Sequence, residues 1–269
     1  MPEIIAVSNQ KGGVGKTTTA VNLSAAMSIL GYKSLLIDLD PQGNASSAAG
    51  LDKRTVSPSI YNVLVELIPI DSAIKQTALP NHFVVGSGND LVGAESELSS
   101  AMARESRLRG AVASAKSRFD FIFIDCPPSL GVLTLNALNA CDRVLVPIQS
   151  EYYAMEGVAQ LIETIQRVKK AWNPAIEIDG LLTMYDPRIV LANQVRDELS
   201  KHLGSRLLTT TIPRNVRIAE APSFGKSIFG YDQGSRGAIA YMSLAKEILA
   251  RRGMPTTVQE PAAIKEATS

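Results

Sequence analysis

The sequence Lys11-Gly-Gly-Val-Gly-Lys-Thr-Thr18 stands between a short apolar run, Ile4–Val7, and a helical pattern, Thr17–Leu30, that is followed by Gly31. The apolar run is typical of a buried strand, and a glycine suits the end of a helix. The three glycines of the loop let the backbone turn its N–H groups toward an anion, and the next helix adds the positive end of its dipole. A strand, a glycine-rich loop and a helix in this order predict a phosphate-binding loop.

The residues of this loop have distinct expected roles. Lys16 is expected to reach the β- and γ-phosphates of a nucleotide, and the Thr17 hydroxyl to ligate Mg²⁺, a hard cation that prefers oxygen. The nucleotide-binding residues of the loop are Lys11, Gly12, Gly13, Val14, Gly15, Lys16, Thr17 and Thr18. Background residue frequencies give this string in a chain of this length with a probability on the order of 10⁻⁶, which disfavours a glycine-rich turn without a ligand.

Apolar runs and helical patterns alternate along the rest of the chain. The expected strands are Ser34–Asp38, Phe83–Gly86, Phe119–Asp125, Arg143–Ile148, Ile178–Met184 and Leu207–Ile212. The expected later helices are Gly93–Lys116, Leu130–Ala140, Met155–Trp172, Ala192–Leu203 and Ser235–Arg252. This alternation predicts an α/β fold with a doubly wound, mostly parallel sheet. We expect a single P-loop domain over residues 1–252 and a disordered tail over 253–269.

The composition is that of an ordinary globular protein, with 45% apolar residues, 20% charged residues and a net charge of +1. Any binding of nucleic acid must therefore come from a local basic patch. The two cysteines, Cys126 and Cys141, lack C-x-x-C spacing, which argues against zinc-ribbon and iron–sulfur classes. We expect Cys126 to be a packed thiol and both His82 and His202 to lie on the surface. The sequence shows no signal peptide and no long apolar run, so the cytoplasm is the expected compartment.

Three aspartates follow the ends of predicted strands. Asp38 ends the strand Ser34–Asp38 and Asp40 follows two residues later, and Asp125 closes the run Phe119–Ile124. In a parallel sheet the carboxyl ends of the strands surround the ligand crevice. Asp125 is therefore expected to hold Mg²⁺ through water, and Asp38 and Asp40 are candidates for the surroundings of the metal and the attacking water.

The phosphate loop departs from the usual pattern, because Gln10 stands where a glycine is usual and Lys11 follows as an extra lysine. In this respect the sequence resembles the deviant Walker A ATPases of the ParA/MinD superfamily. Segments that resemble its ParA/Soj chromosome-partitioning members are Asp40-Pro-Gln-Gly-Asn44, Asp125-Cys-Pro-Pro-Ser-Leu-Gly131, Glu151-Tyr-Tyr-Ala-Met-Glu-Gly157, Ile212-Pro-Arg-Asn-Val-Arg217, Ala219-Glu-Ala-Pro-Ser-Phe-Gly-Lys226 and Tyr231-Asp-x-x-Ser-Arg-Gly237. The resemblance covers nearly the whole chain.

The resemblance implies a Mg²⁺-dependent ATPase that forms an ATP-bound sandwich homodimer. Lys11 would reach across the dimer interface to the partner's phosphates, much as an arginine finger does. Asp40 would position the attacking water near the metal, so the catalytic candidates are Lys11, Lys16 and Asp40 and the metal-site candidates are Thr17, Asp40 and Asp125. The adenine would lie against the loop Pro213, Arg214 and Asn215.

The resemblance also implies that the ATP-bound dimer binds DNA of any sequence. A ParB-type centromere-binding protein would stimulate hydrolysis and release the dimer from the nucleoid, which would segregate a chromosome or a plasmid. Arg188 and Arg217 are the candidate DNA phosphate contacts, with Arg196 and Lys201 as additions. Positive side chains that contact phosphates release counterions and need not read bases.

Alternatives on the same scaffold stay open. A MinD-like ATPase that cycles on membranes would need an amphipathic C-terminal helix, whereas the tail holds two prolines and no aromatic residue. A metal-cluster ATPase would need two ligand cysteines per subunit at the dimer interface. A metabolic carboxylase-ligase would need a dedicated substrate pocket, and a non-catalytic scaffold gated by nucleotide overlaps with the ATPase.

Overall fold

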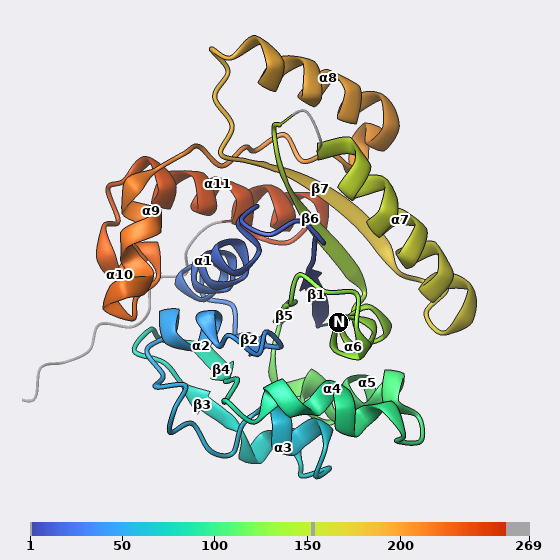
Figure 1. The fold of residues 1–269 in the computed structure, drawn as a ribbon. Coiled ribbons are helices and arrows are strands. Elements are labelled where there is room, and N and C mark those ends of the chain that lie inside the picture. Colours follow the sequence, from blue (N-terminus) through green and yellow to red (C-terminus); the bar gives the residue numbers. More distant parts are fainter. Residues whose placement is uncertain (1, 152–153, 257–269) are drawn as a thin grey trace, which may run out of the picture.

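The computed structural model describes residues 2–151 and 154–256. They form a seven-stranded sheet in the order β3-β4-β2-β5-β1-β6-β7, with helices on both faces (Figure 1). Only the edge pair of β3 and β4 is antiparallel. The doubly wound, mostly parallel α/β fold is therefore confirmed. Most of the tail expected to be disordered lies outside the described residues.

The central strands are buried on both faces, as their continuous apolar sequences indicate. The strands are β1 (Glu3–Val7), β2 (Ser34–Asp38), β3 (Ile74–Gln76), β4 (His82–Val85), β5 (Phe121–Asp125), β6 (Arg143–Gln149) and β7 (Glu177–Thr183). Their register places the last residues of β1, β2 and β5 side by side, with Val7 and Asp38 each opposite Asp125. Functional residues that follow these strands therefore meet at one edge of the sheet.

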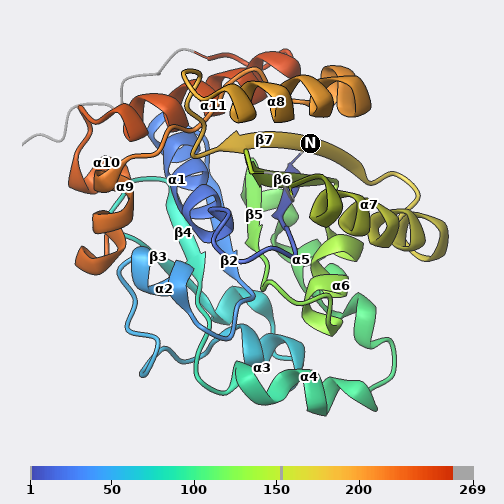
Figure 2. The same ribbon diagram turned by 45° about the horizontal axis from the view of Figure 1, so that its top comes forward.

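The helices divide between two apolar clusters, one on each face of the sheet (Figure 2). One face carries α1 (Lys16–Ile29), α2 (Asn44–Ala48), α10 (Ile228–Tyr231) and α11 (Arg236–Arg251). The other carries α3 (Ile60–Leu64), α4 (Leu91–Ser99), α5 (Arg107–Ala115), α6 (Val132–Ala140), α7 (Ala154–Ala171) and α8 (Val190–Leu203). The short helix α9 (Val216–Glu220) precedes α10. Within residues 2–151 and 154–256, no helix is long and apolar enough to cross a bilayer.

The single helix predicted over Gly93–Lys116 is wrong, because α4 and α5 are separate helices. Between them Ala103 adopts a left-handed conformation with a φ of 51°. The side-chain amide of Asn136 on α6 donates to the carbonyl of Arg104 at 2.6 Å. This contact holds the connecting chain in a turn, which interrupts the helix despite its favourable apolar spacing.

The strand predicted over Leu207–Ile212 is also wrong, since this segment touches β7 only through isolated bridges at its two ends. The backbone N–H groups of Thr209 and Thr210 donate to the carboxylate of Glu247 on α11, at 2.8 and 2.7 Å. Arg251 on the same helix donates to the Leu207 carbonyl at 3.2 Å. Side chains of α11 thus occupy backbone groups that a ladder would need.

His82 is buried, with 2% of its surface exposed, so its predicted surface position is wrong. Its two ring nitrogens lie 2.9 Å from the hydroxyls of Ser24 and Thr77. Burial lowers the pKa of His82 to about 4. The other two expectations are confirmed, because His202 is exposed and Cys126 is a buried, packed thiol.

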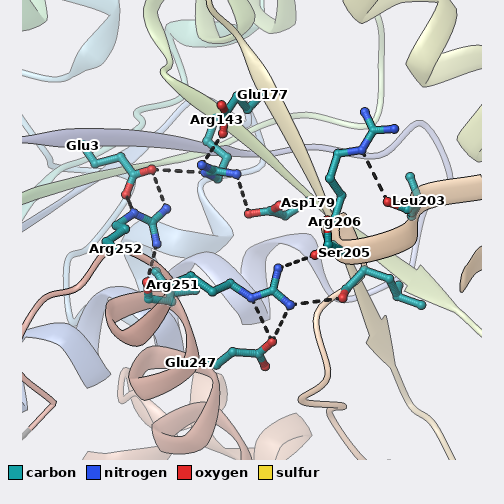
Figure 3. Close-up of polar contacts among 12 residues, drawn as sticks. Glu3, Arg143, Glu177, Asp179, Leu203, Ser205, Arg206, Glu247, Arg251 and Arg252 are labelled. Carbon is teal, nitrogen blue, oxygen red and sulfur yellow. Dashed lines mark hydrogen bonds and ion pairs between the residues drawn. The ribbon is translucent and has the colours of Figure 1, made fainter.

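An ion-pair network joins the amino-terminal ends of β1, β6 and β7 (Figure 3). The guanidinium of Arg143 lies 3.2 Å from the Glu3 carboxylate and 2.9 Å from that of Asp179, and it also contacts Glu177. Arg252, just beyond α11, pairs with Glu3. These ion pairs hold the end of α11 against the amino-terminal ends of the strands, whereas the phosphate loop follows the carboxyl end of β1.

Candidate active site

The loop between β1 and α1 is curled as a phosphate-binding loop requires. Gly13 and Gly15 have φ values of 75° and 88°, which other residues rarely adopt. Helix α1 begins at Lys16, directly after Gly15. The first N–H groups of the helix have no partner within it, so they can bind an anion together with the loop amides.

Two polar side chains that the sequence pattern does not single out fix this loop. The Thr183 hydroxyl, at the carboxyl end of β7, donates to the Val14 carbonyl at 2.8 Å. Asn9 accepts a hydrogen bond from the Lys11 N–H at 3.1 Å and donates to the Pro147 carbonyl at 2.8 Å. The position of Thr183 at the end of a predicted strand is the signal that could have identified it.

The two lysines of the loop have different surroundings. Lys16 is 7% exposed, and its ammonium donates to the Lys11 carbonyl at 3.0 Å. Burial lowers the pKa of Lys16, and the charge of Asp125 opposes this effect. The Lys11 side chain instead leaves the loop and pairs with Glu151 at 2.6 Å, with 36% of its own surface exposed. Lys16 is thus buried against its own loop, whereas the Lys11 side chain is partly exposed and pairs with a residue outside the loop.

Asp38 fastens the segment that carries Asp40. Its carboxylate accepts hydrogen bonds from the Ser46 N–H and hydroxyl, both at 2.7 Å, and from the Asp40 N–H at 3.1 Å. Burial raises the pKa of Asp38 to about 6. These contacts fix the turn from β2 into α2, so Asp38 holds in place the segment that carries Asp40.

Asp40 lies in the turn after β2 and is 8% exposed. One of its carboxylate oxygens accepts a hydrogen bond from the Gln42 N–H at 2.9 Å. The other oxygen makes no hydrogen bond with the described part of the chain. Asp40 therefore helps to form the turn, and its second carboxylate oxygen can accept a hydrogen bond from a ligand or a water molecule.

Asp125 is fully buried, and neither of its carboxylate oxygens has a hydrogen-bond partner among residues 2–151 and 154–256. Burial raises the pKa of Asp125 well above its usual range, and the charge of Asp38 raises it further, while the charge of Lys16 partly opposes this. A buried carboxylate without partners is unfavourable unless a ligand completes it. A hydrated Mg²⁺ suits such oxygens, so Thr17 and Asp125 fit a Mg²⁺ ion bound with ATP.

The loop predicted to hold adenine follows Ile212, which forms an isolated β-bridge with Thr183. Thr183 in turn contacts Val14 of the phosphate loop, so the two loops lie near each other. Pro213 is half-buried and Arg214 is exposed. Asn215 caps α9, since its side-chain oxygen accepts the Ile218 N–H at 3.2 Å. The side-chain oxygen is thus engaged in the cap, and the amide nitrogen of Asn215 remains to contact a base.

The four basic residues predicted to bind DNA do not form one cluster in a single chain. Arg196 and Lys201 lie on α8 and Arg188 just before it, whereas Arg217 lies on α9, apart from α8 (Figures 1 and 2). Each is paired with a nearby acid: Arg188 with Asp186 at 2.7 Å, Arg196 with Asp197 at 2.8 Å, Lys201 with Glu198 at 2.8 Å, and Arg217 with Glu220 at 3.1 Å. Such exposed pairs are screened by water and contribute little, so phosphates can displace these acids.

Comparisons with known proteins agree with this geometry. A family model described as an AAA domain matches residues 2–178. The sporulation initiation inhibitor protein Soj of Bacillus subtilis is 49% identical over 251 residues, covering 93% of this chain and 99% of Soj. The chromosome partitioning protein ParA of Caulobacter vibrioides is 45% identical over 251 residues, covering 92% of this chain and 94% of ParA.

A solved structure shares both the fold and part of the sequence. It is cobyrinic acid a,c-diamide synthase from Mycobacterium smegmatis with a bound ATP analog and magnesium. The two chains are 35% identical with a TM-score of 0.82, and the match covers 94% of this chain and 96% of the synthase. The nucleotide and metal in that structure are the ligands that the present site fits.

Proposed function

Because the chain belongs to the ParA/Soj family of chromosome-partitioning ATPases, we propose that two copies close face to face around two molecules of Mg·ATP. The chain is an ATPase that uses ATP and Mg²⁺. The contrast between the two lysines carries the proposal of a dimer. Lys16 is buried against its own loop and bonds to the Lys11 carbonyl, while the Lys11 side chain pairs with Glu151 outside the loop. A lysine at the mouth of the loop can neutralise phosphate charge in a facing subunit.

In this proposal, catalysis rests on positioning and charge neutralisation, which phosphoryl transfer mainly requires. The amides of residues 12–18 and the Lys16 ammonium hold the phosphates. Thr17 and Asp125 would hold Mg²⁺, and the metal would neutralise charge on the phosphate oxygens. Asp40 orients the attacking water, and Lys11 of the facing subunit stabilises the charge that develops. The loop 213–215 holds the adenine.

We further propose that the ATP-bound dimer binds nucleoid DNA of any sequence in the cytoplasm. The contacts come from Arg188 and Arg217, with Arg196 and Lys201 as additions. Pairing two chains doubles a patch that is weak in one chain, so DNA affinity depends on the nucleotide state. A ParB-type protein stimulates hydrolysis and thereby releases the dimer, which segregates a chromosome or a plasmid.

A metabolic synthase activity is the second candidate, since a solved synthase is 35% identical and shares the fold. The two candidates differ in what the ATP-bound state recognises. A partitioning ATPase binds DNA in that state, whereas a synthase binds a small substrate and has no requirement for DNA.

The test is DNA binding by the Asp40→Ala variant with ATP, with ADP and without nucleotide. Loss of the water-orienting carboxylate is expected to leave ATP binding intact and to trap the dimer. We expect binding to DNA of arbitrary sequence with ATP alone, weakened by salt. A trapped dimer that ignores DNA at low salt would contradict the proposal and favour the synthase or a membrane-cycling ATPase.

A double variant, Arg188→Glu with Arg217→Glu, tests the proposed contacts within the same assay. It is expected to lose DNA binding while it still dimerises with ATP. Its matched control is Arg167→Glu, because Arg167 is also exposed and also paired with a nearby acid, Glu163. DNA binding by the double variant equal to that of the control would exclude these two contacts.

A further inference from the structure

Glu151 lies at the end of the Lys11 side chain. It lies two residues after Gln149, the last residue of β6, and its N–H donates to the Gln149 carbonyl at 2.8 Å, which forms a tight turn. The Glu151 carboxylate accepts a hydrogen bond from the Lys11 ammonium at 2.6 Å. The two residues are 140 positions apart in the chain, so the fold, and not local sequence, brings them together.

The backbone of Lys11 is fixed at both of its polar groups. The N–H donates to Asn9 at 3.1 Å, and the carbonyl accepts the Lys16 ammonium at 3.0 Å. Only the side chain of Lys11 is therefore free to change its partner without a change in the phosphate loop. Within its own subunit that partner is Glu151.

We propose that Glu151 is a positioning residue that holds Lys11 on its own subunit until ATP brings a second subunit close. This inference rests on the proposed role of Lys11 across a dimer interface. The carboxylate keeps the ammonium away from the phosphate site of its own loop, and the triphosphate of a facing subunit competes for it with a larger negative charge.

The exposure of the pair sets how strongly it can hold Lys11. The Glu151 side chain is 49% exposed and the Lys11 side chain 36% exposed. Pairs with this exposure typically contribute about 0.2–1 kcal/mol, which corresponds to roughly 1.4- to fivefold in an equilibrium constant. The contact is thus strong enough to shift dimerisation and weak enough for ATP to break it.

The experiment measures the concentration of a non-hydrolysable ATP analogue that gives half-maximal dimerisation of the full chain, by sedimentation. Glu151→Gln removes the charge and keeps the shape, so it should lower this concentration about two- to fivefold. Glu151→Asp, which keeps the charge, should restore part of the difference. Glu163→Gln is the control, because Glu163 forms an exposed pair with Arg167 at 2.6 Å, away from the loop.

A second readout follows Lys11 itself in the nucleotide-free protein. The rate at which an acylating reagent modifies its ammonium should rise about two- to fivefold in Glu151→Gln and stay unchanged in Glu163→Gln. A residue that merely stabilised the fold would leave this rate unchanged. Equal labelling in both variants, or dimerisation of Glu151→Gln that needs the same or more analogue, would overturn the inference.

Lys11→Ala separates this inference from the proposed function. If Lys11→Ala dimerises as the wild type does and hydrolyses ATP at the same rate, then the role of Lys11 in a facing subunit is wrong. If Lys11→Ala loses ATP-dependent dimerisation while Glu151→Gln behaves as wild type, only the role of Glu151 is wrong.

Discussion

The amino-terminal and the carboxyl ends of the strands differ in how their buried charged groups are compensated. At the amino-terminal ends of β1, β6 and β7, Arg143 contacts Glu3 and Asp179, so acids and bases neutralise one another (Figure 3). At the carboxyl ends of β2 and β5, Asp38 and Asp125 lie side by side, and the oxygens of Asp125 have no partner in the described part of the chain.

The difference separates stability from function within one layer of strands. The ion pairs of Arg143 and Arg252 fix the position of α11, and these charges are compensated without a ligand. Two adjacent buried carboxyl groups with raised pKa values lower the stability of the nucleotide-free protein. A bound cation would stabilise their charged forms. Binding of Mg·ATP is thus expected to offset the loss of stability caused by the acids at the carboxyl ends of β2 and β5.

The largest effect is expected from Asp125→Asn, which removes a buried carboxyl group that has no hydrogen-bond partner in the described part of the chain. Hydrolysis of ATP should fall about a thousandfold, because the Mg²⁺ environment supplies several kcal/mol of charge stabilisation. The free energy of unfolding without nucleotide should stay the same or rise, because the variant no longer buries an ionisable group whose pKa is raised in the folded protein. Steady-state hydrolysis and chemical denaturation measure the two quantities. A variant that is both inactive and destabilised would contradict the contrast.

Arg143→Met tests the opposite edge. Removing the shared base leaves Asp179 and Glu3 with less compensation, so the free energy of unfolding should fall by about 3 kcal/mol. Hydrolysis by the folded protein should keep its rate, since the phosphate loop lies at the other edge. Arg167→Met, which breaks an exposed pair, is the control and should change stability by less than about 1 kcal/mol. Equal effects of the two variants would refute the role of the network.

The pH dependence of stability should separate a buried histidine from a buried aspartate. The pKa of His82 is lowered from 6.5 to about 4, so the unfolded chain binds the proton first and stability falls as the pH drops. The pKa of Asp38 is raised from 3.8 to about 6, so the folded chain binds the proton first and stability gains. Between pH 7 and 5 these contributions are about −2 and about +1 kcal/mol.

Denaturation at several pH values checks this pair of expectations. His82→Gln should flatten the acid-induced loss of stability, because glutamine can still contact both hydroxyls without titrating. Asp38→Asn should steepen it. Parallel pH profiles for the wild type and both variants would show that neither group titrates as its surroundings indicate.

The smallest effect is expected from Thr183→Val, which removes a hydrogen bond that shapes the phosphate loop. A neutral hydrogen bond contributes about 1 kcal/mol, so the affinity for ATP should fall about fivefold. Thr183→Ser keeps the hydroxyl and is the control. Calorimetric titration with nucleotide measures both. An unchanged affinity in the valine variant would mean that the loop keeps its shape without this anchor.

Local sequence could predict the sheet, the phosphate loop and the acids that follow the strands. Apolar periodicity reports burial, and the loop chemistry is contained in eight consecutive residues, Lys11–Thr18. Asp125 is predictable because a carboxylate that closes a wholly apolar strand must face the ligand edge of a parallel sheet.

The remaining features depend on residues that only the fold brings together. Thr183 is 169 positions from the loop carbonyl it holds, and Glu151 is 140 positions from Lys11. His82 looks like a surface residue at the start of a strand, yet a serine of α1 and a threonine satisfy its ring inside the protein. The position of Thr183 at the end of a strand can mark it as a candidate, but the sequence does not show which group each of these residues contacts.

The most direct test of the contrast between the two edges is the number of protons released when Mg·ADP binds. Calorimetry in buffers with different ionisation enthalpies, at pH 6.5, gives this number. If the metal binds beside Asp38 and Asp125, it lowers their raised pKa values, so the wild type releases protons on binding. Asp125→Asn then releases fewer protons. Equal proton release by the two proteins would contradict the claim that Asp125 is left without a partner for the sake of Mg·ATP.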